Sequence, residues 1–392
     1  MLPNDRNIRI GFVGVGNISG IYLENITKNF KEIEIIGVCD LVREKAERAV
    51  KQYNIPKLYN DMYELFADPE VDIVLNITRP YEHYEVSKAA LEAGKPVYSE
   101  KPLAATLEEG KALLELAKEK GLALGGAPDT FLGAGIQGAK KLLADGLIGD
   151  VIGGALHMIC HGHETWHPDP AFYYDKIGGG PMLDMGPYYV TAAVNLIGPV
   201  QAVTGFTKST YPTRLITSQP LNGTVIDVGC PTYYQGVLKF VNGAILSIIM
   251  TFDVYGLPNK ECIELYGTKG SMTVPDPNGF GGGYTVATAG TESLKSAING
   301  ADVKMHYPAK ISNPVKAYSQ NSRALGLADM AKALQTGRDA RASVNLTYHV
   351  LEVLSAMETA SAEGKTVIIE SAKDFKQPAP LPLDQEQWVL GS

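Results

Sequence analysis

The 392-residue sequence has few cysteines, no long apolar run and no excess of basic residues, and each absence excludes a class of protein. The four cysteines are widely spaced, without the close pairs of redox motifs and structural zinc sites, so reduced thiols are expected. No apolar stretch approaches the roughly 18 residues that a membrane helix needs, and the polar first residues lack the apolar core of a secretory signal. We therefore expect a cytoplasmic protein without membrane contact.

The charge balance argues against a nucleic-acid partner. Lys and Arg number 35 against 43 Asp and Glu, a net charge of −8, and no segment combines clustered basic residues with aromatic ones. With 45% hydrophobic and 20% charged residues, the composition is that of a globular protein longer than one hydrophobic core usually supports. Two domains and a small-molecule ligand are expected.

The first third of the chain alternates short apolar runs with amphipathic segments. Buried strands are expected at Ile8–Val13, Ile33–Val38, Val71–Ile77, Val97–Tyr98 and Leu122–Leu124. Helices are expected at Ile18–Phe30, Leu41–Tyr53, Tyr81–Ala93 and Leu107–Lys120, with Gly94 and Gly121 at the ends of the last two. This alternation is typical of a doubly wound parallel α/β sheet. We assign residues 1–128 to a dinucleotide-binding domain of the Rossmann type.

The pattern changes after Pro128. A helix at Phe131–Leu143 precedes strands expected at Val151–Cys160, Ala202–Thr207, Tyr233–Phe240, Ala244–Phe252 and Cys262–Tyr266. The Asn242-Gly243 pair predicts a tight hairpin, and Pro275–Tyr284 is expected as a loop. Further helices are expected at Pro187–Ile197, Tyr318–Thr336 and Leu346–Glu363. Residues 129–392 should therefore form an α+β domain with a large, mostly antiparallel open sheet that helices cover on one face.

A glycine-rich turn follows the first strand and leads into a helix. Gly14 permits the tight turn, and Gly16 lets the backbone approach a pyrophosphate. Asn17 and Ile18 complete the turn, and the helix after them offers N–H groups without partners to a phosphate. Ser19 occupies the place of the usual third glycine. The turn predicts a dinucleotide site.

An acidic residue ends the second strand. Asp40 follows the turn by about 20 residues, where a carboxylate can accept hydrogen bonds from the adenine ribose. A carboxylate there would repel the 2′-phosphate of NADP. NAD is therefore favoured over NADP, although Arg43 nearby leaves room for NADP.

Three further motifs occur in order along the chain: Glu100-Lys101-Pro102 after the fourth predicted strand, the segment from Gly178 to Tyr188, and Leu265-Tyr266-Gly267-Thr268-Lys269-Gly270. With the glycine-rich turn, they resemble the glucose-fructose oxidoreductase, inositol dehydrogenase and rhizopine catabolism (Gfo/Idh/MocA) family over nearly the whole chain. The resemblance implies an NAD-dependent oxidoreductase that acts on CH–OH groups. It also implies cofactor contacts at Thr78, Pro80, His83, Glu100 and Lys101. For His83, helix capping or packing is an equal alternative.

The resemblance implies that Lys101 is catalytic. It follows a parallel strand at its carboxyl end, where open α/β sheets bind ligands, and an ammonium there can stabilise charge on a reacting hydroxyl. The competing interpretation is a surface lysine in a turn.

Asp184 and Tyr188 are four residues apart, so they share a helical face or lie close together if a helix begins near Gly186. Many family members have His where Tyr188 stands. A tyrosine base needs a neighbouring cation such as Lys101, because its ordinary pKa is near 10. Tyr188 is the first choice as proton acceptor, Asp184 orients the substrate or is itself the base, and a loop histidine is a third alternative. Asp184 could instead simply cap a helix.

The segment from His161 to His167 contains three histidines and a glutamate. We expect a loop over the substrate pocket, in which Trp166 contacts a sugar ring and His163 or His167 binds hydroxyls. Purely structural histidines and a zinc site are the alternatives. The segment lacks the helical His-Glu-x-x-His register, so no metal is predicted.

The predicted reaction is removal of hydride from a carbinol carbon of a sugar, glycoside or polyol to NAD, with C3 of a glucose-type pyranoside as one candidate position. Two other functions stay open: an NAD-dependent glycosidase that works by transient oxidation, and a regulatory protein that senses NAD or a sugar without catalysis. An exposed face of the second sheet would favour a homodimer or homotetramer.

Overall fold

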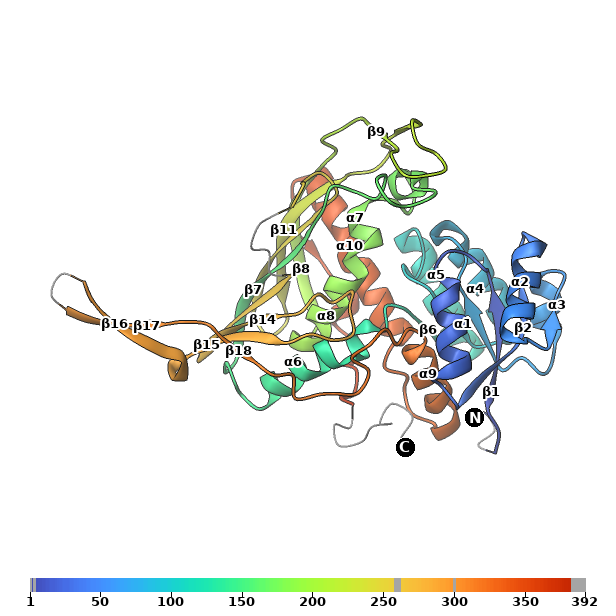
Figure 1. The fold of residues 1–392 in the computed structure, drawn as a ribbon, viewed down its shortest axis with the longest axis horizontal. Coiled ribbons are helices and arrows are strands. Elements are labelled where there is room, and N and C mark those ends of the chain that lie inside the picture. The colour runs from blue at the N-terminus through green and yellow to red at the C-terminus, as the bar shows by residue number, and fades with distance from the viewer. Residues whose placement is uncertain (1, 3–4, 257–261, 299–300, 382–392) are drawn as a thin grey trace.

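The computed structural model describes residues 2, 5–256, 262–298 and 301–381, which form two adjacent domains and a projecting arm (Figure 1). The last residues of the expected second domain, 382–392, lie outside the described residues.

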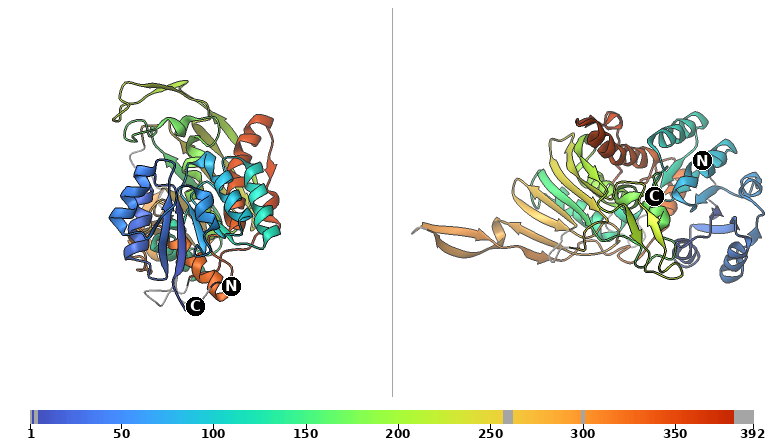
Figure 2. Two further views of the ribbon diagram at one scale, coloured as in Figure 1. Left: turned by 90° about the vertical axis from the view of Figure 1, so that its right-hand side faces the viewer. Right: turned by 90° about the horizontal axis from the view of Figure 1, so that it is seen from above.

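The first domain is a parallel six-stranded sheet with the order β3-β2-β1-β4-β5-β6. Its strands are β1 (Ile8–Val13), β2 (Ile33–Cys39), β3 (Lys57–Leu58), β4 (Ile73–Asn76), β5 (Val97–Ser99) and β6 (Leu124–Gly126). Its helices are α1 (Ser19–Lys28), α2 (Arg43–Tyr53), α3 (Met62–Ala67), α4 (His83–Glu92) and α5 (Leu107–Lys120). Helices flank the sheet on both sides (Figure 2). Ile10 and Phe12 belong to one hydrophobic cluster and Val13 and Val74 to another, so both faces of the sheet are buried as predicted.

The second domain contains a nine-stranded sheet with the order β18-β15-β14-β13-β7-β12-β11-β8-β19. Every pairing is antiparallel except that of β7 with β12. The strands are β7 (Val151–Ile159), β8 (Val200–Lys208), β11 (Tyr233–Phe240), β12 (Ile245–Thr251), β13 (Ile263–Gly267), β14 (Gly270–Val274), β15 (Tyr284–Thr288), β18 (Ala309–Ile311) and β19 (Val367–Ile368). One face is covered by α6 (Ala134–Ala144), α7 (Gly180–Asp184), α8 (Gly186–Ile197) and α10 (Val344–Glu363) (Figure 1). The predicted open, mostly antiparallel sheet is confirmed.

The chain returns to the first domain near its end. Helix α9 (Leu325–Thr336) packs against β6, and Gly125 forms a β-bridge with Ser343 just before α10. Helix α10 also packs against α5. The predicted boundary after residue 128 stays a prediction, although the first sheet ends at Gly126.

The helix expected at Tyr318–Thr336 was placed wrongly at its start, because α9 begins only at Leu325. Tyr318 has a φ of 56° and Ala324 a φ of 83°, both in the left-handed region that a right-handed helix excludes. Residues 318–324 instead form an irregular segment between β18 and α9. The hairpin predicted at Asn242-Gly243 is confirmed, since it joins the antiparallel strands β11 and β12.

Two small two-stranded ribbons extend from the second domain. The strands β9 (Thr213–Leu215) and β10 (Val225–Asp227) pair beside the segment that follows β7. The strands β16 (Glu292–Ile298) and β17 (Ala301–His306) form the arm that projects from the body in Figure 1. No disulfide joins the four cysteines, all of which lie in the described part of the chain. Among the described helices, none combines the length and hydropathy required to cross a bilayer.

Candidate active site at the junction of the two domains

Lys101 and Asp184 meet where the two domains join. Lys101 comes two residues after β5, and Asp184 is the last residue of α7. The Lys101 Nζ lies 2.7 Å from Asp184 Oδ1 and donates a second hydrogen bond of 2.8 Å to the Asp184 backbone oxygen. The two side chains are only 17% and 10% exposed. The predicted lysine and carboxylate therefore form a nearly buried ion pair that links the domains.

The ion pair fixes the charges of both residues. Burial by itself favours the neutral lysine, but the charges of Asp184, Tyr188 and Glu100 outweigh it and raise the pKa of Lys101. Burial likewise opposes the Asp184 carboxylate, but Lys101 and His163 hold the pKa of Asp184 well below its usual range. Near neutral pH the site contains a stable ammonium and a stable carboxylate.

His163 binds the second carboxylate oxygen. Its Nε2 lies 2.9 Å from Asp184 Oδ2, and because an ionised carboxylate only accepts, Nε2 carries the hydrogen. The imidazole is enclosed by the rings of Trp166, Tyr173 and Phe252, at centroid distances of 5.1, 4.4 and 4.7 Å. Its Nδ1 is buried without a hydrogen-bond partner among the described residues. His163 thus orients Asp184 in this structure.

Tyr188 lies beside the ion pair on a separate helix. Helices α7 and α8 are distinct, so Asp184 and Tyr188 do not share one helix but are brought together by the junction at Met185, the second of the two predicted arrangements. The Lys101 Nζ is 5.4 Å from the centroid of the Tyr188 ring. Burial raises the pKa of Tyr188, and the opposing effects of Lys101 and Arg323 offset only part of that rise. Tyr188 is 6% exposed, so its ring is fixed by packing.

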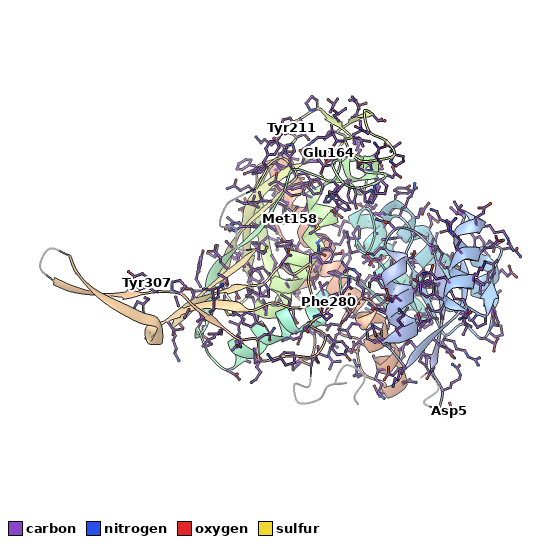
Figure 3. The ribbon with its side chains drawn as sticks, viewed as in Figure 1. Asp5, Met158, Glu164, Tyr211, Phe280 and Tyr307 are labelled. Carbon is purple, nitrogen blue, oxygen red and sulfur yellow. The ribbon has the colours of Figure 1, made fainter. Side chains whose placement is uncertain are left out.

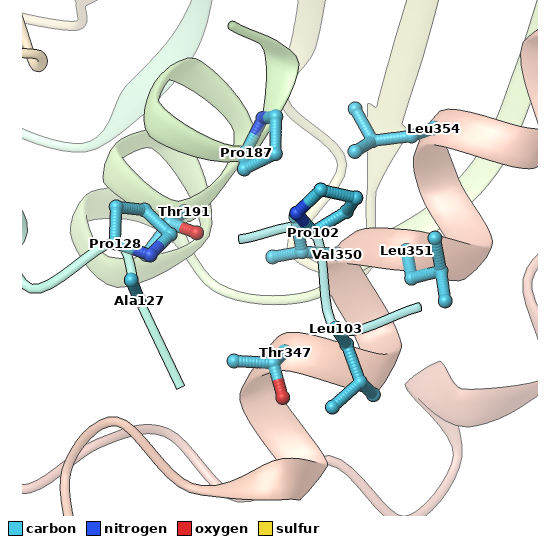
Figure 4. A pocket seen from close by; sticks show the side chains of 10 residues that line it. All are labelled: Pro102, Leu103, Ala127, Pro128, Pro187, Thr191, Thr347, Val350, Leu351 and Leu354. Carbon is cyan, nitrogen blue, oxygen red and sulfur yellow. The ribbon is translucent and has the colours of Figure 1, made fainter. Parts of the chain in front are cut away.

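Apolar packing fixes the positions of Lys101 and Tyr188 relative to each other. Pro102 follows Lys101 and Pro187 precedes Tyr188, and both line one small cavity (Figure 4). The other wall comes from α10, through Leu351 and Leu354. Because proteins pack densely, contact between the neighbours of two catalytic candidates fixes the distance between the candidates themselves.

A buried charge cluster anchors the segment that contains His163. Arg214 donates to Glu164 at 3.0 Å and pairs with Asp253, and these three side chains are at most 5% exposed. Tyr174 donates its hydroxyl hydrogen to Glu164, and Arg214 also binds the backbone oxygen of His161 at 3.1 Å. Figure 3 places Glu164 at the upper end of the second domain. The segment after β7 is therefore a tightly anchored loop.

The other residues of this loop have separate environments. The ring of His161 stacks on that of Tyr255, with the ring centroids 3.7 Å apart. His167 is buried, and its Nδ1 accepts the backbone N–H of Asp169 at 3.1 Å. Trp166 is 58% exposed. Over the described ranges, no three His, Cys, Asp or Glu side chains are grouped as metal ligands.

The glycine-rich turn is tight at Gly14 and open on one side at Gly16. Gly14 has a φ of 94°, and a Cβ there would lie 2.7 Å from the backbone oxygen of Ile77. A Cβ at Gly16 would meet no atom within 4 Å, so the backbone is open to a ligand on that side. Ser19 replaces the third glycine without a clash, because its hydroxyl turns back to the Gly16 oxygen at 2.7 Å. Asn17 and Ile18 are exposed at the beginning of α1.

Asp40 is fixed by the turn itself. Its carboxylate accepts the backbone N–H groups of Val15 at 2.5 Å and Val42 at 2.7 Å. Leu41 beside it is 94% exposed, an apolar surface suited to an adenine ring. Arg43 binds elsewhere: it donates to Glu47 at 3.0 Å and to Asn60 at 2.9 Å. The turn, the acid and the exposed apolar edge fit a bound NAD.

The remaining predicted cofactor residues lie at the carboxyl ends of β4 and β5. Thr78 is half-buried and donates to Asn76 Oδ1 at 2.7 Å, and Pro80 begins a short 3₁₀ turn. His83 is buried, with Nδ1 2.7 Å from the Pro102 oxygen and Nε2 3.1 Å from the Thr78 oxygen. Its contacts join the turn after β4 to the turn after β5, and its predicted contact with the cofactor stays a prediction.

Glu100 points into the protein. It accepts the Tyr22 hydroxyl at 2.5 Å and the Lys101 backbone N–H at 2.9 Å. The carboxylate therefore shapes the turn that presents Lys101.

The sequence did not reveal Arg323 or Arg214 as contributors, and it pointed to Glu164 only as a possible zinc ligand beside the histidines. Arg323 donates to the Tyr188 hydroxyl oxygen at 3.3 Å across 135 residues of sequence, and Arg214 binds Glu164 across 50. Nothing in the local pattern distinguishes these arginines from surface ones. Only the fold brings them to the site.

Two successive segments of the chain match known family models. Residues 8–126 match the model described as "Oxidoreductase family, NAD-binding Rossmann fold", and residues 136–273 match the "GFO/IDH/MocA C-terminal domain".

Named relatives and solved structures agree with these matches. The chain is 28% identical to levoglucosan dehydrogenase of Pseudarthrobacter phenanthrenivorans over 246 residues, which is 58% of this chain and 62% of that protein. It is 33% identical to inositol 2-dehydrogenase/D-chiro-inositol 3-dehydrogenase of Lactiplantibacillus plantarum over 144 residues, 36% of this chain and 41% of that protein. The matches thus span less than two thirds of these relatives.

The fold is shared with solved structures over most of its length. An NAD-binding oxidoreductase from Klebsiella pneumoniae superposes with a TM-score of 0.75 at 20% identity, covering 93% of this chain and 99% of that one. A levoglucosan dehydrogenase complex with NADH and levoglucosan gives a TM-score of 0.73 at 22% identity, covering 93% and 100%. With both of its domains matched in order, this chain belongs to the Gfo/Idh/MocA oxidoreductase family.

Proposed function

We propose that the protein is an NAD-dependent dehydrogenase that oxidises a hydroxyl group of a sugar, glycoside or polyol. The observation that carries this proposal is the contact between Lys101, at the carboxyl end of a parallel strand, and Asp184 from the second domain, with Tyr188 beside them. Open α/β sheets bind their ligands at that edge. Named relatives that oxidise levoglucosan and inositols support the substrate class.

The cofactor proposed is NAD rather than NADP. Gly14, Gly16 and the beginning of α1 would hold the pyrophosphate, and Asp40 the adenine ribose. Arg43, the cation nearest to Asp40 in the sequence, is engaged by Glu47 and Asn60, which disfavours its contact with a 2′-phosphate. When bound, the nicotinamide supplies a hydride acceptor.

Lys101 would orient the substrate and stabilise charge. An ammonium has three hydrogens to donate, and two of them are used on Asp184. The third can bind the reacting hydroxyl and stabilise its oxygen as the proton leaves. Because its pKa is raised, Lys101 stays positively charged throughout the physiological range.

Tyr188 would accept the hydroxyl proton. Both oxygens of Asp184 already accept hydrogen bonds, from Lys101 and from His163, and its lowered pKa makes it a weak base. The ring of Tyr188 lies beside Lys101, whose Nζ is 5.4 Å from the ring centroid, and this cation favours the ionised form of the phenol. In this assignment Asp184 and His163 hold Lys101 in position.

The substrate would lie against the loop after β7. Trp166 is more than half exposed there and offers an aromatic surface for a sugar ring. C3 of a glucose-type pyranoside is one candidate position of oxidation. His167 lies behind Trp166, with ring centroids 5.4 Å apart, and supports that surface.

A panel of sugars, glycosides and inositols, incubated with NAD and analysed by mass spectrometry, tests the function. The expected product is the substrate minus two hydrogens, with stoichiometric NADH. Hydrolysed glycoside without net NADH would replace the proposal with the glycosidase alternative. Binding of NAD without turnover of any member would favour the regulatory alternative.

We also propose a homodimer or homotetramer. The face of the nine-stranded sheet opposite the helices exposes large apolar side chains, among them Phe206 at 76% and Ile245 at 54%. A patch of this kind favours association with a second copy. Sedimentation equilibrium of the full chain and of Phe206→Lys tests this, because a monomeric wild type would exclude it.

A further inference from the structure

Arg323 is a cation that the proposed mechanism has so far not used. Its Nη2 lies 3.3 Å from the Tyr188 hydroxyl oxygen and 3.3 Å from Asn278 Oδ1. Within the described ranges, no carboxylate lies within 4 Å of its guanidinium. Lys101, by contrast, is neutralised by Asp184. Glu100 and Asp129 act on Arg323 only through charge at longer range, so its guanidinium is the cation that hydrogen-bonds directly to the Tyr188 oxygen.

The backbone of Arg323 is fixed from the first domain. Asn25 of α1 donates hydrogen bonds to the backbone oxygens of Asn321, at 3.2 Å, and Arg323, at 2.9 Å. Tyr318 stacks on Phe30 with ring centroids 6.4 Å apart. The segment before α9 is thus bound to the nucleotide-binding domain, while the guanidinium reaches a tyrosine of the other domain.

Five groups determine how readily Tyr188 loses its proton. Lys101 and Arg323 favour the phenolate, the latter both by charge and by its hydrogen bond. Glu100 opposes it, and Tyr173 is a further titratable neighbour. Asp184 faces Lys101 and offsets part of the lysine's effect. Burial, the largest of these causes, opposes the phenolate, and the charge and hydrogen bond of Arg323 offset part of that effect.

We propose that Arg323 is a positioning residue that orients the Tyr188 hydroxyl and stabilises the phenolate that accepts the substrate proton. This inference rests on the proposed function. In the step concerned, the O–H bond of the substrate breaks and an O–H bond forms on Tyr188. Before the step Arg323 donates to a phenolate, and after it to a neutral phenol. A charged donor binds a phenolate more strongly than a phenol, so Arg323 favours the state that is ready to react.

The experiment measures the titration of Tyr188 directly, in protein without substrate. Tyrosine labelled with ¹³C at Cζ reports ionisation by NMR, and the signal lost in Tyr188→Phe identifies the residue. Arg323→Gln should move the midpoint upward by about one pH unit or more, because a charged hydrogen-bond donor is lost. Arg323→Lys should give an intermediate midpoint. Asn25→Ala should give a smaller shift in the same direction, since it only loosens the backbone.

Arg9→Gln serves as the matched control, because Arg9 pairs with Glu70 on the surface and should leave the midpoint unchanged. Equal midpoints in the wild type and Arg323→Gln, or no titration of Tyr188 below about pH 11 in the wild type, would overturn the proposal. Thermal melts of each variant exclude unfolding as the cause of any shift.

Kinetics give a second readout. For hydroxyl oxidation, kcat/KM should rise with pH as Tyr188 ionises. In Arg323→Gln the midpoint of this rise should shift upward by as many pH units as the NMR midpoint. Added guanidinium should move the midpoint part of the way back to the wild-type value. A rise that does not move would count against the role of Arg323. Full activity of Tyr188→Phe would instead disprove the assignment of Tyr188 as proton acceptor, while the NMR shift would still decide whether Arg323 controls the ionisation of Tyr188.

Discussion

The nucleotide side and the substrate side of the site are built by different means. On the nucleotide side, Gly14, Gly16 and the beginning of α1 present backbone, and Asp40 accepts hydrogen bonds from neighbouring N–H groups. On the substrate side, buried ion pairs place the functional groups, with Arg214 anchoring the loop and Lys101 bound to Asp184.

The difference has a physical origin. A pyrophosphate is recognised by backbone N–H groups, whose positions depend on local turn geometry. A substrate hydroxyl is bound by side chains that come from distant segments of the chain and meet at one site. Charged side chains that are buried at such a site must be paired. The substrate side should therefore be the more sensitive to single substitutions.

The largest effect is expected for Arg214→Met. It leaves Glu164 and Asp253 buried without their cation, and removing one partner from a buried pair costs about 3–5 kcal/mol. Urea unfolding, followed by circular dichroism, measures the loss. Arg9→Met removes an exposed pair and should cost less than about 1 kcal/mol. Similar losses of unfolding free energy in Arg214→Met and Arg9→Met would show that the substrate side is not the more sensitive of the two.

Lys101→Met should lower kcat by about 10²–10³-fold, because it removes the charge that stabilises the reacting oxygen. NADH binding, measured by fluorescence titration, should fall by a much smaller factor than kcat, since the turn and Asp40 are untouched and only the predicted contact at Lys101 is lost. A kcat within tenfold of the wild type would exclude the catalytic role of Lys101.

Two buried carboxylates should respond to pH with opposite signs. Asp129, after β6, accepts the N–H of Gly326, and burial raises its pKa to about 6. A folded pKa above the unfolded value of about 3.9 means that its contribution to stability is present below pH 4 and is lost as the pH rises through 6. Asp129→Asn should therefore raise the free energy of unfolding at pH 8 by about 2–3 kcal/mol relative to the wild type.

Asp184 supplies the counterpart. Its lowered pKa means that its contribution to the free energy of unfolding is present above about pH 4 and is lost as the pH falls below that value. Asp184→Asn should then destabilise the protein at pH 8, as measured by the same urea titrations. Changes of the same sign in the free energy of unfolding of Asp129→Asn and Asp184→Asn at pH 8 would contradict the environments described for these two carboxylates.

The smallest effect is expected for Asp40→Ala. Loss of its hydrogen bonds to the adenine ribose should weaken NADH binding by about tenfold. The preference for NADH over NADPH should become smaller, because the carboxylate that repels the 2′-phosphate is removed. Fluorescence titrations with both nucleotides measure the ratio. Arg43→Ala should leave that ratio unchanged, since Arg43 binds Glu47 and Asn60. A changed ratio in Arg43→Ala would show that this side chain contacts the nucleotide.

The regular elements followed the sequence closely. Ile8–Val13, Leu107–Lys120 and Tyr233–Phe240 were predicted with the bounds that the structure has. In each case hydrophobic periodicity and local end signals agree. Short elements such as α3 and β3 were missed because few residues contribute a pattern. The start of α9 was misplaced because helical spacing cannot reveal left-handed backbone at Tyr318 and Ala324.

The sequence by itself determined the order of the two domains, the nucleotide turn with Asp40, and Lys101, Asp184 and Tyr188 as candidates, because each depends on local spacing. Only the tertiary structure decided their partners: His163 on Asp184, Arg323 on Tyr188 and Arg214 beneath the loop. These contacts join residues 21 to 135 positions apart. Local pattern contains no information about which distant charges folding will bury together, since the energy of such pairs depends on the surroundings that the completed fold provides.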